Sequence, residues 1–222
     1  MDWLEYIAAF GAFFVLHQVP TRPPMKARLV ALVGSRGFTA LYSALSLGIL
    51  WWLFAAAQRA PYVEIWQWQP WQNGVPLVAM ALVCVLIALA VGRPNPFSFG
   101  GAQNEQFNVE KPGIVKWMRH PLLVALAIWA TAHMVPNGDL AHILVFGSFA
   151  AFALLGQRLV DRKKQREMGA RWGELRDALQ NSSVSISSSI LPRVSLGLGA
   201  FAGLLWLHQY LFGVSPIAIF IS

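Results

Sequence analysis

Residues 119–139 read RHPLLVALAIWATAHMVPNGD, an apolar run with His120 at its beginning and His133 near its end. Ionisable side chains are costly in hydrocarbon, so an imidazole kept there usually faces a partner, a cofactor or a proton path. A third histidine, His17, lies in a different apolar segment near the N-terminus. We therefore expect a membrane helix within 119–139, and we expect these histidines to be the main candidates for chemistry.

The composition of the whole chain indicates an integral membrane protein. Of its 222 residues, 56% are hydrophobic and only 12% are charged, whereas a soluble domain carries about 25% charged residues. A formal net charge of +7 is also typical of nucleic-acid binding, but these basic residues lie between apolar segments, where they report topology. We expect the lipid bilayer as a partner and no nucleic acid. Cys84 is the single cysteine, so the chain cannot form an intramolecular disulfide.

Six apolar segments are each close to the ~20 residues that a helix needs to cross a hydrocarbon core of ~30 Å. The expected fold is an all-α, polytopic membrane bundle of six helices, formed by one domain over 1–222. Pro121 fits the first turn of the fourth helix, where no backbone N–H is needed. Gly199 and Gly203 predict close packing of the last helix. The predicted spans are about 3–20, 38–58, 75–92, 118–135, 140–160 and 194–213.

The lysines and arginines are distributed unevenly between the two sides of this bundle. All but Arg59 lie in three segments: 21–37, 92–119 and 158–193. Because basic loops stay in the cytoplasm, both chain termini are expected on the non-cytoplasmic side. The predicted basic cytoplasmic loop, 161–193, begins with 161–180. We interpret that stretch as an extension of the fifth helix or as a surface helix broken near Gly169.

Each histidine has an ordinary structural explanation beside a functional one. For His17 and His133, a hydrogen-bonded position in the core and a ligand role are equally open. Arg119 and His120, at the cytoplasmic end of the fourth span, either cap the interface or hold an anionic group such as a cofactor carboxylate or phosphate. The two remaining histidines are expected to be structural: His142 and His208.

Several other chemistries lack their motifs in this sequence. It has no cysteine cluster or HExxH motif for zinc, and no GxGxxG or Walker motif for nucleotides. Carboxylates in the apolar segments are scarce, which argues against a proton-coupled transporter. Two neutral imidazoles that face each other are a suitable axial pair for haem iron. The apolar segments and the neighbouring Arg or His residues would suit such a cofactor.

A series of short motifs follows one order along nearly the whole chain: His17 with the Pro/Arg-containing stretch after it, Arg119-His120-Pro121, Trp129 with Ala132-His133, Asn137-Gly138-Asp139, Asp161-Arg162, and His208 before 211–216. This ordered set resembles the NnrU family of membrane proteins. The other known branch of that family is the plastid and cyanobacterial 15-cis-zeta-carotene isomerase. The resemblance is closer to the bacterial branch, so we expect an integral protein of the bacterial inner membrane.

The resemblance implies haem b as the cofactor. In the isomerase branch, the iron is thought to be held by a histidine of the first helix and by the histidine of the Trp-x-x-Ala-His motif. Those positions correspond to His17 and His133. Arg119 and His120 are then expected near the haem propionates. A cysteine that has been linked to ligation in that branch is replaced here by Ala130, so a cysteine-assisted ligand switch is not implied.

The predicted topology raises a competing ligand. At 1.5 Å per residue, His133 lies roughly 20 Å from His120 along the fourth helix, near the outer face. His17 lies towards the inner face, because it follows some fifteen residues of the first span. His17 and His120 are therefore closer in depth than His17 and His133, and His120 competes with His133 for the iron.

We expect a haem-b-binding membrane protein whose ligand is a lipophilic polyene or a small diatomic molecule. The resemblance implies a redox-gated cis-trans isomerase or a role in nitric oxide and denitrification metabolism. One alternative is a membrane S-adenosylmethionine-dependent methyltransferase of the isoprenylcysteine type, which the Arg119-His120-Pro121 motif also resembles, although the Tyr-x-Gly that often follows is missing. Another alternative is a non-catalytic accessory protein that responds to nitric oxide.

Overall fold

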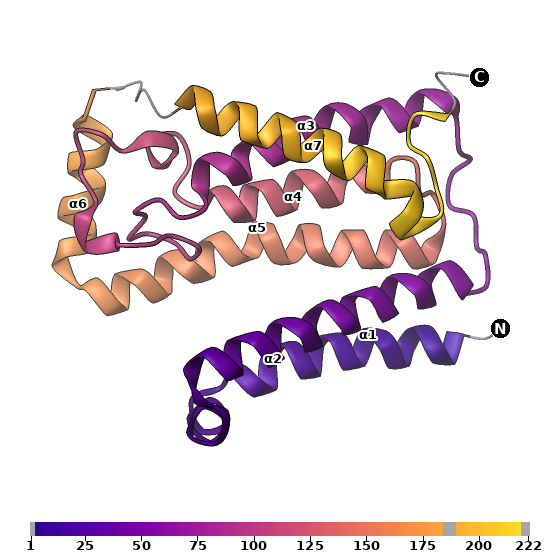
Figure 1. Cartoon of the computed structure of the whole chain (residues 1–222), viewed down its shortest axis with the longest axis horizontal. Coiled ribbons are helices and arrows are strands. Elements are labelled where there is room, and N and C mark those ends of the chain that lie inside the picture. The colour runs from indigo at the N-terminus through magenta and orange to yellow at the C-terminus, as the bar shows by residue number, and fades with distance from the viewer. Residues whose placement is uncertain (1–2, 184–189, 219–222) are drawn as a thin grey trace. The chain divides into compact units, whose positions relative to one another are not determined.

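The computed structural model describes residues 3–183 and 190–218, which are predominantly helical (Figure 1). The expectation of an all-helical chain is confirmed. Within the described ranges, the only strand-like pairing is one antiparallel bridge between Glu64 and Asp139. The helices are α1 (Trp3–Gln18), η1 (Val19–Thr21), α2 (Pro23–Arg59), η2 (Pro70–Asn73), α3 (Gly74–Ala90), η3 (Asn104–Gln106), η4 (Gly113–Lys116), α4 (Pro121–Met134), α5 (Leu140–Met168), α6 (Ala170–Asn181) and α7 (Ile190–Phe212).

Four helical segments of the described chain are long and apolar enough to cross a membrane. They are Pro23–Arg59, Pro70–Ala90, Leu140–Met168 and Ile190–Phe212. The helices α1 and α4 overlap the predicted spans 3–20 and 118–135, but they have only 16 and 14 residues. Both are shorter than the ~20 residues of an average membrane crossing. The helix lengths thus support a membrane protein and identify four of the six expected crossings.

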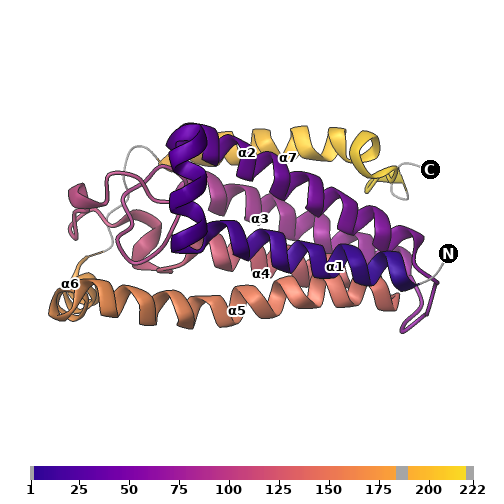
Figure 2. The same ribbon diagram turned by 90° about the horizontal axis from the view of Figure 1, so that it is seen from below.

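The second predicted span, 38–58, begins too late. The sequence predicts a loop over 21–37, whereas the structure has helix from Pro23 onward. Prolines are tolerated in a first turn, whose N–H groups have no partner within the helix. Gly34 then takes non-helical angles, φ 73° and ψ 166°, and the turns before it point away from the rest of α2 (Figures 1 and 2). The basic stretch is therefore a short helix before a glycine break.

The chain divides into two compact units, Met1–Trp66 with Gly138–Val145 and Gln67–Asn137 with Phe146–Ser222. In the first unit, α1 and α2 pack side by side (Figure 2). The buried hydroxyl of Tyr6 donates a hydrogen bond of 2.9 Å to the Ala141 carbonyl at the beginning of α5. Next to Tyr6 in α1, Glu5 forms an ion pair with Arg59, the last residue of α2. These contacts join α1 to the first turn of α5 and to the end of α2.

In the second unit, α3 packs against both α4 and α7 (Figure 1). The close approach of α7 occurs at Gly197, where a Cβ atom would stand 2.7 Å from the Cα of Val85. Gly199 and Gly203, at which the sequence predicts close packing of this helix, make no such contact within the described residues, because a Cβ at either position would meet nothing within 4 Å. These glycines lie on a different face of α7 from Gly197. On the α5 side, α4 packs in a cluster that includes Ala153.

Three consecutive residues shape the turn between α4 and α5. The side chain of Asn137 donates a hydrogen bond of 2.7 Å to the His133 carbonyl near the end of α4. Asp139 accepts one of 3.2 Å from a backbone amide in the first turn of α5. Gly138 leaves no room for a side chain, because a Cβ would lie 2.2 Å from the Trp66 carbonyl oxygen. The Asn-Gly-Asp motif therefore has a structural explanation in capping and close packing.

The basic stretch after the fifth apolar segment is helical, in agreement with the sequence analysis. The helix α5 continues to Met168, and Gly169 interrupts it with φ 59° before α6 begins. One face of α6 packs against the segment between α3 and α4 in a buried cluster: Phe97, Val115, Trp172 and Leu179. Residues 184–189 of the predicted loop 161–193 lie outside the described residues.

Candidate functional site

The irregular segment 91–120 holds the beginning of α4 in place. The side-chain amide of the buried Asn95 donates a hydrogen bond of 2.9 Å to the Arg119 carbonyl. The Asn95 side-chain oxygen accepts one of 3.1 Å from the Phe97 amide. His120 then occupies the N-cap position, and Pro121 is the first residue of α4, as the sequence predicts. Arg119 and His120 are thereby fixed at one end of the helix.

Both side chains bind one carboxylate, that of Asp161 in α5. Nη2 of Arg119 lies 2.7 Å from Oδ2 of Asp161, and its Nε lies 3.3 Å from Oδ1. Nε2 of His120 lies 3.0 Å from the same Oδ1. Because a carboxylate only accepts hydrogen bonds, this Nε2 carries a hydrogen. In the neutral imidazole, Nδ1 is then left to accept from the Ser98 hydroxyl, 3.1 Å away.

The group Arg119–His120–Asp161, here called the ionic brace, joins the beginning of α4 to α5. The His120 ring is only 3% exposed, and both of its nitrogens are engaged. An iron ion could use His120 only after the bond to Asp161 or to Ser98 had broken. An anion near Arg119 would compete with a carboxylate already in bidentate contact. The geometry thus favours a structural role for the brace, and the propionate contacts expected of Arg119 and His120 stay a prediction.

The ring of Trp172 in α6 lies beside the brace. The guanidinium carbons of Arg119 and Arg176 lie 5.9 and 5.5 Å from its centre, within the range of cation–π attraction. Its Nε1 is buried and has no hydrogen-bond partner among the described residues. The α6 helix is therefore attached to the brace through an aromatic ring that two arginines approach.

His133, at the other end of α4, has a different environment. Its Nδ1 lies 2.8 Å from the Trp129 carbonyl oxygen, so Nδ1 carries the hydrogen and Nε2 keeps a lone pair. Within the described residues, Nε2 has no hydrogen-bond partner. The rings of Trp129 and Phe146 each lie 5.5 Å from the imidazole. His133 is therefore an oriented imidazole in aromatic surroundings with one nitrogen open.

His17 belongs to the first unit, near the end of α1. Its ring stacks on Phe13 at 5.3 Å, and Tyr42 lies 5.7 Å away. The Tyr42 hydroxyl donates to the His17 carbonyl at 2.7 Å, which holds this part of α1 against α2. Neither ring nitrogen of His17 has a hydrogen-bond partner in the described part of the chain. His17 and His133 thus share this feature, but they belong to different units.

The two histidines that were expected to be structural make local contacts. Nδ1 of His142 lies 2.7 Å from Oδ2 of Asp139, three residues earlier. Nδ1 of His208 lies 2.8 Å from the Val214 carbonyl oxygen. No group of three or more His, Cys, Asp or Glu side chains in 3–183 and 190–218 is arranged to hold a metal ion. A haem, which needs one or two imidazoles, is unaffected by that finding.

Sequence reasoning gave Asp161 no role in the candidate site. Its partner His120 is 41 residues away along the chain, so no helical or strand period links the two. One signal was present, because Asp161 is an isolated carboxylate at the beginning of the basic run 162–166. A lone acid among bases at the end of an apolar helix is a candidate for pairing with a cation on a neighbouring helix.

The fold places this protein among the helical proteins whose long apolar helices are suited to a lipid bilayer. A family model described as NnrU protein matches residues 5–216. The match covers nearly the whole chain, and the protein belongs to the NnrU family. None of the curated proteins and none of the solved structures matches the chain significantly.

Proposed function

We propose that this NnrU-family protein binds haem b and that His133 ligates the iron. The observation that carries the proposal is the hydrogen bond of 2.8 Å from Nδ1 of His133 to the Trp129 carbonyl. Metal-ligating histidines commonly donate their second ring N–H to a carbonyl or carboxylate, which fixes the tautomer and the ring orientation. In His133 this bond leaves the Nε2 lone pair as the available donor.

The surroundings of His133 also suit a porphyrin. Trp129 contacts Phe146 and Phe149 at ring distances of 5.3 and 5.6 Å, so aromatic side chains line this part of the second unit. His17, whose ring nitrogens are also open, is the second ligand in this proposal, on the basis of the family resemblance. When bound, haem b would supply a redox-active iron that can take a small diatomic ligand or act on a lipophilic polyene.

The ionic brace has a separate role in this proposal. Thirteen positions of the chain, or about 20 Å of helix, separate His120 from His133. We assign Arg119 and His120 to holding α5 through Asp161, and His133 to the cofactor. A propionate contact at Arg119 requires that an anion displace Asp161, so Asp161→Asn should strengthen haem retention if Arg119 is a propionate anchor. Unchanged haem retention in that variant would support a purely structural role for Arg119 and His120.

The test is an optical spectrum of the full chain, purified in detergent from haem-replete bacteria. We expect a Soret band and a reduced-minus-oxidised difference spectrum of a histidine-ligated haem b. His17→Ala and His133→Ala should lose the band, and added imidazole should restore it in His133→Gly. A colourless wild-type protein would overturn the proposal. Saturable binding of S-adenosylhomocysteine by that colourless protein would favour the methyltransferase alternative.

We further infer six membrane crossings in the bacterial inner membrane, with both termini on the non-cytoplasmic side. The long apolar helices and the confinement of nearly all basic residues to alternate connections support this topology. In a Cys84→Ser background, a membrane-impermeant thiol reagent should label Tyr62→Cys in spheroplasts. It should label Arg176→Cys only after the membrane is opened. Labelling of Arg176→Cys in sealed spheroplasts would overturn the topology.

A further inference from the structure

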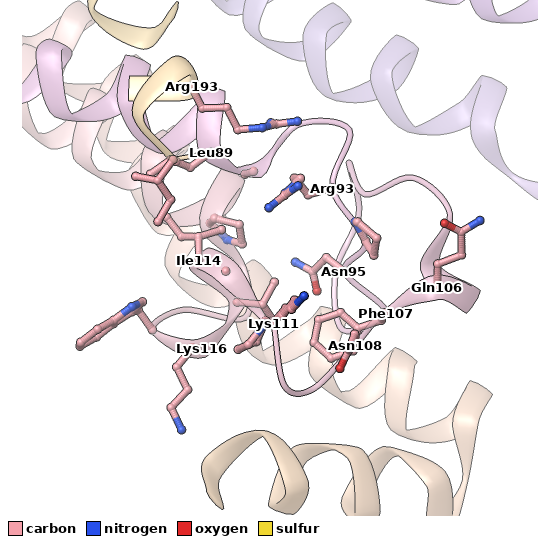
Figure 3. A pocket seen from close by; sticks show the side chains of 18 residues that line it. Leu89, Arg93, Asn95, Gln106, Phe107, Asn108, Lys111, Ile114, Lys116 and Arg193 are labelled. Carbon is pink, nitrogen blue, oxygen red and sulfur yellow. The ribbon is translucent and has the colours of Figure 1, made fainter. Parts of the chain in front are cut away.

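A cavity of about 400 Å³ lies where the end of α3 and the beginning of α7 meet the segment 91–120 (Figure 3). Its volume lies within the range of small-molecule sites. Arg193 of α7 fixes one side, because its Nη1 donates hydrogen bonds of 2.7 and 3.0 Å to the carbonyls of Ala88 and Val91. The cavity therefore lies beside α3 and α7, which these hydrogen bonds join at its edge.

The lining of this cavity is cationic. Arg93, Lys111, Lys116 and Arg193 contribute to it, whereas none of its lining residues is Asp or Glu. Lys116 points away from the other labelled side chains (Figure 3). Its ammonium donates hydrogen bonds of 2.7–2.9 Å to carbonyls at the end of α6. The lining thus holds four cations and no carboxylate, and the resulting positive potential attracts an anion.

Two of these cations lie near the middle of the cavity. The side chains of Arg93 and Lys111 gather there with that of Asn95 (Figure 3). The backbone of Arg93 is held on both sides, because its amide donates to Ala90 and its carbonyl accepts from Ala102. The Lys111 ammonium has no hydrogen bond or ion pair with any described residue. Arg93, whose backbone is held in place, and Lys111 thus face the same space.

The remaining walls are largely apolar. Leu89 and Ile190 belong to α3 and α7, and Phe107 and Ile114 come from the connecting segment. Leu89 lies at the end of one membrane-length helix and Ile190 at the beginning of another, so the cavity has the depth at which lipid headgroups lie. The positive end of the α7 dipole adds to the attraction for an anion.

We propose that this cavity binds an anionic phospholipid, with its phosphate between Arg93, Lys111 and Arg193. The acyl chains then follow Leu89 and Ile190 towards the hydrocarbon. The apolar walls distinguish this ligand from free phosphate, and the missing carboxylates distinguish it from a zwitterionic lipid, whose ammonium needs an anionic partner. This site is independent of the haem proposal, since none of its residues is a candidate iron ligand.

The test is native mass spectrometry of the detergent-solubilised full chain, titrated with phosphatidylglycerol and, separately, with phosphatidylcholine. Phosphatidylglycerol should bind more tightly, and added salt should weaken its binding. Lys111→Gln should weaken phosphatidylglycerol about tenfold, because it removes one charge-assisted hydrogen bond. Phosphatidylcholine affinity should change little in the same variant. Lys111 is exposed and its ammonium is unpaired among the described residues, so this substitution should leave the melting temperature unchanged.

The matched control is Arg171→Gln, which removes an exposed cation of α6 that does not line the cavity. It should leave phosphatidylglycerol affinity within about twofold of wild type. Equal affinities for the two lipids, or equal effects of Lys111→Gln and Arg171→Gln, would overturn the proposal. Displacement of the lipid by millimolar inorganic phosphate would also overturn it, because the cavity would then be a site for free anions.

Discussion

The two ends of α4 each carry a histidine, and the two rings differ in how their nitrogens are used. At the beginning of the helix, Asp161 and Ser98 engage both nitrogens of His120. Near its end, a carbonyl of the same helix engages only Nδ1 of His133. The free-energy cost of burying a polar group is offset when all of its donors and acceptors form hydrogen bonds. A fully paired imidazole is thus explained by structure, whereas a half-paired one in aromatic surroundings is a candidate ligand.

The largest effect on stability is expected at the brace. Asp161→Ala removes the partner of a buried imidazole and of Arg119, and it should lower the free energy of unfolding by about 3 kcal/mol. Asp177→Ala is the control, because Asp177 is exposed on α6, and its effect should stay within about 0.5 kcal/mol. Denaturant titration in detergent, followed by far-UV circular dichroism, measures both. Similar values for the two variants would show that the brace contributes little.

A smaller effect is expected in the turn that follows His133. Gly138→Ala should cost about 2 kcal/mol, because the new Cβ would collide with the Trp66 carbonyl. Gly199→Ala is the control and should raise the stability, since its Cβ would meet no atom of the described residues within 4 Å. Alanine is favoured over glycine inside a helix, so this variant should gain about 0.5 kcal/mol. Thermal melting in detergent checks the pair, and equal shifts in melting temperature would contradict the packing at Gly138.

The smallest effect on stability is expected where Lys116 contacts the end of α6. Lys116→Gln removes an ammonium that donates to three carbonyls, those of Leu179, Gln180 and Ser182. It should lower the stability by about 1 kcal/mol. Lys163→Gln should have no measurable effect, because Lys163 is 67% exposed and its ion pair is on the surface. Faster proteolysis near 182 in Lys116→Gln, and not in Lys163→Gln, would locate the effect.

Local signals in the sequence predict much of the helical framework. Pro121 begins α4 and Gly169 ends α5 at the expected positions, because proline and glycine act through their own backbone geometry. The same type of signal is ambiguous at 21–37: the sequence predicts a loop there, but proline also begins helices, and Pro23 is the first residue of α2. Such errors concern the ends of helices and leave the fold class unchanged.

Contacts between helices were much harder to predict. The role of Gly197 depends on which face of α7 meets α3, and the i, i+4 spacing of Gly199 and Gly203 carries no information about that face. The partner of His120 could not be identified for a similar reason, because pairing with Asp161 depends on how α4 lies against α5. The hydrogen bond of His133 to the Trp129 carbonyl, four residues earlier, is local. Its spacing could have been anticipated from a helical period.

The central claim is that the haem ligand on α4 is His133 and not His120. Haem per polypeptide, measured by pyridine haemochrome on monodisperse protein, tests it in His133→Gln and His120→Gln side by side. The His120→Gln amide can still donate to Asp161, so this variant should fold and keep the haem of the wild-type protein. His133→Gln should lose it. Loss of haem in His120→Gln with retention in His133→Gln would contradict the account.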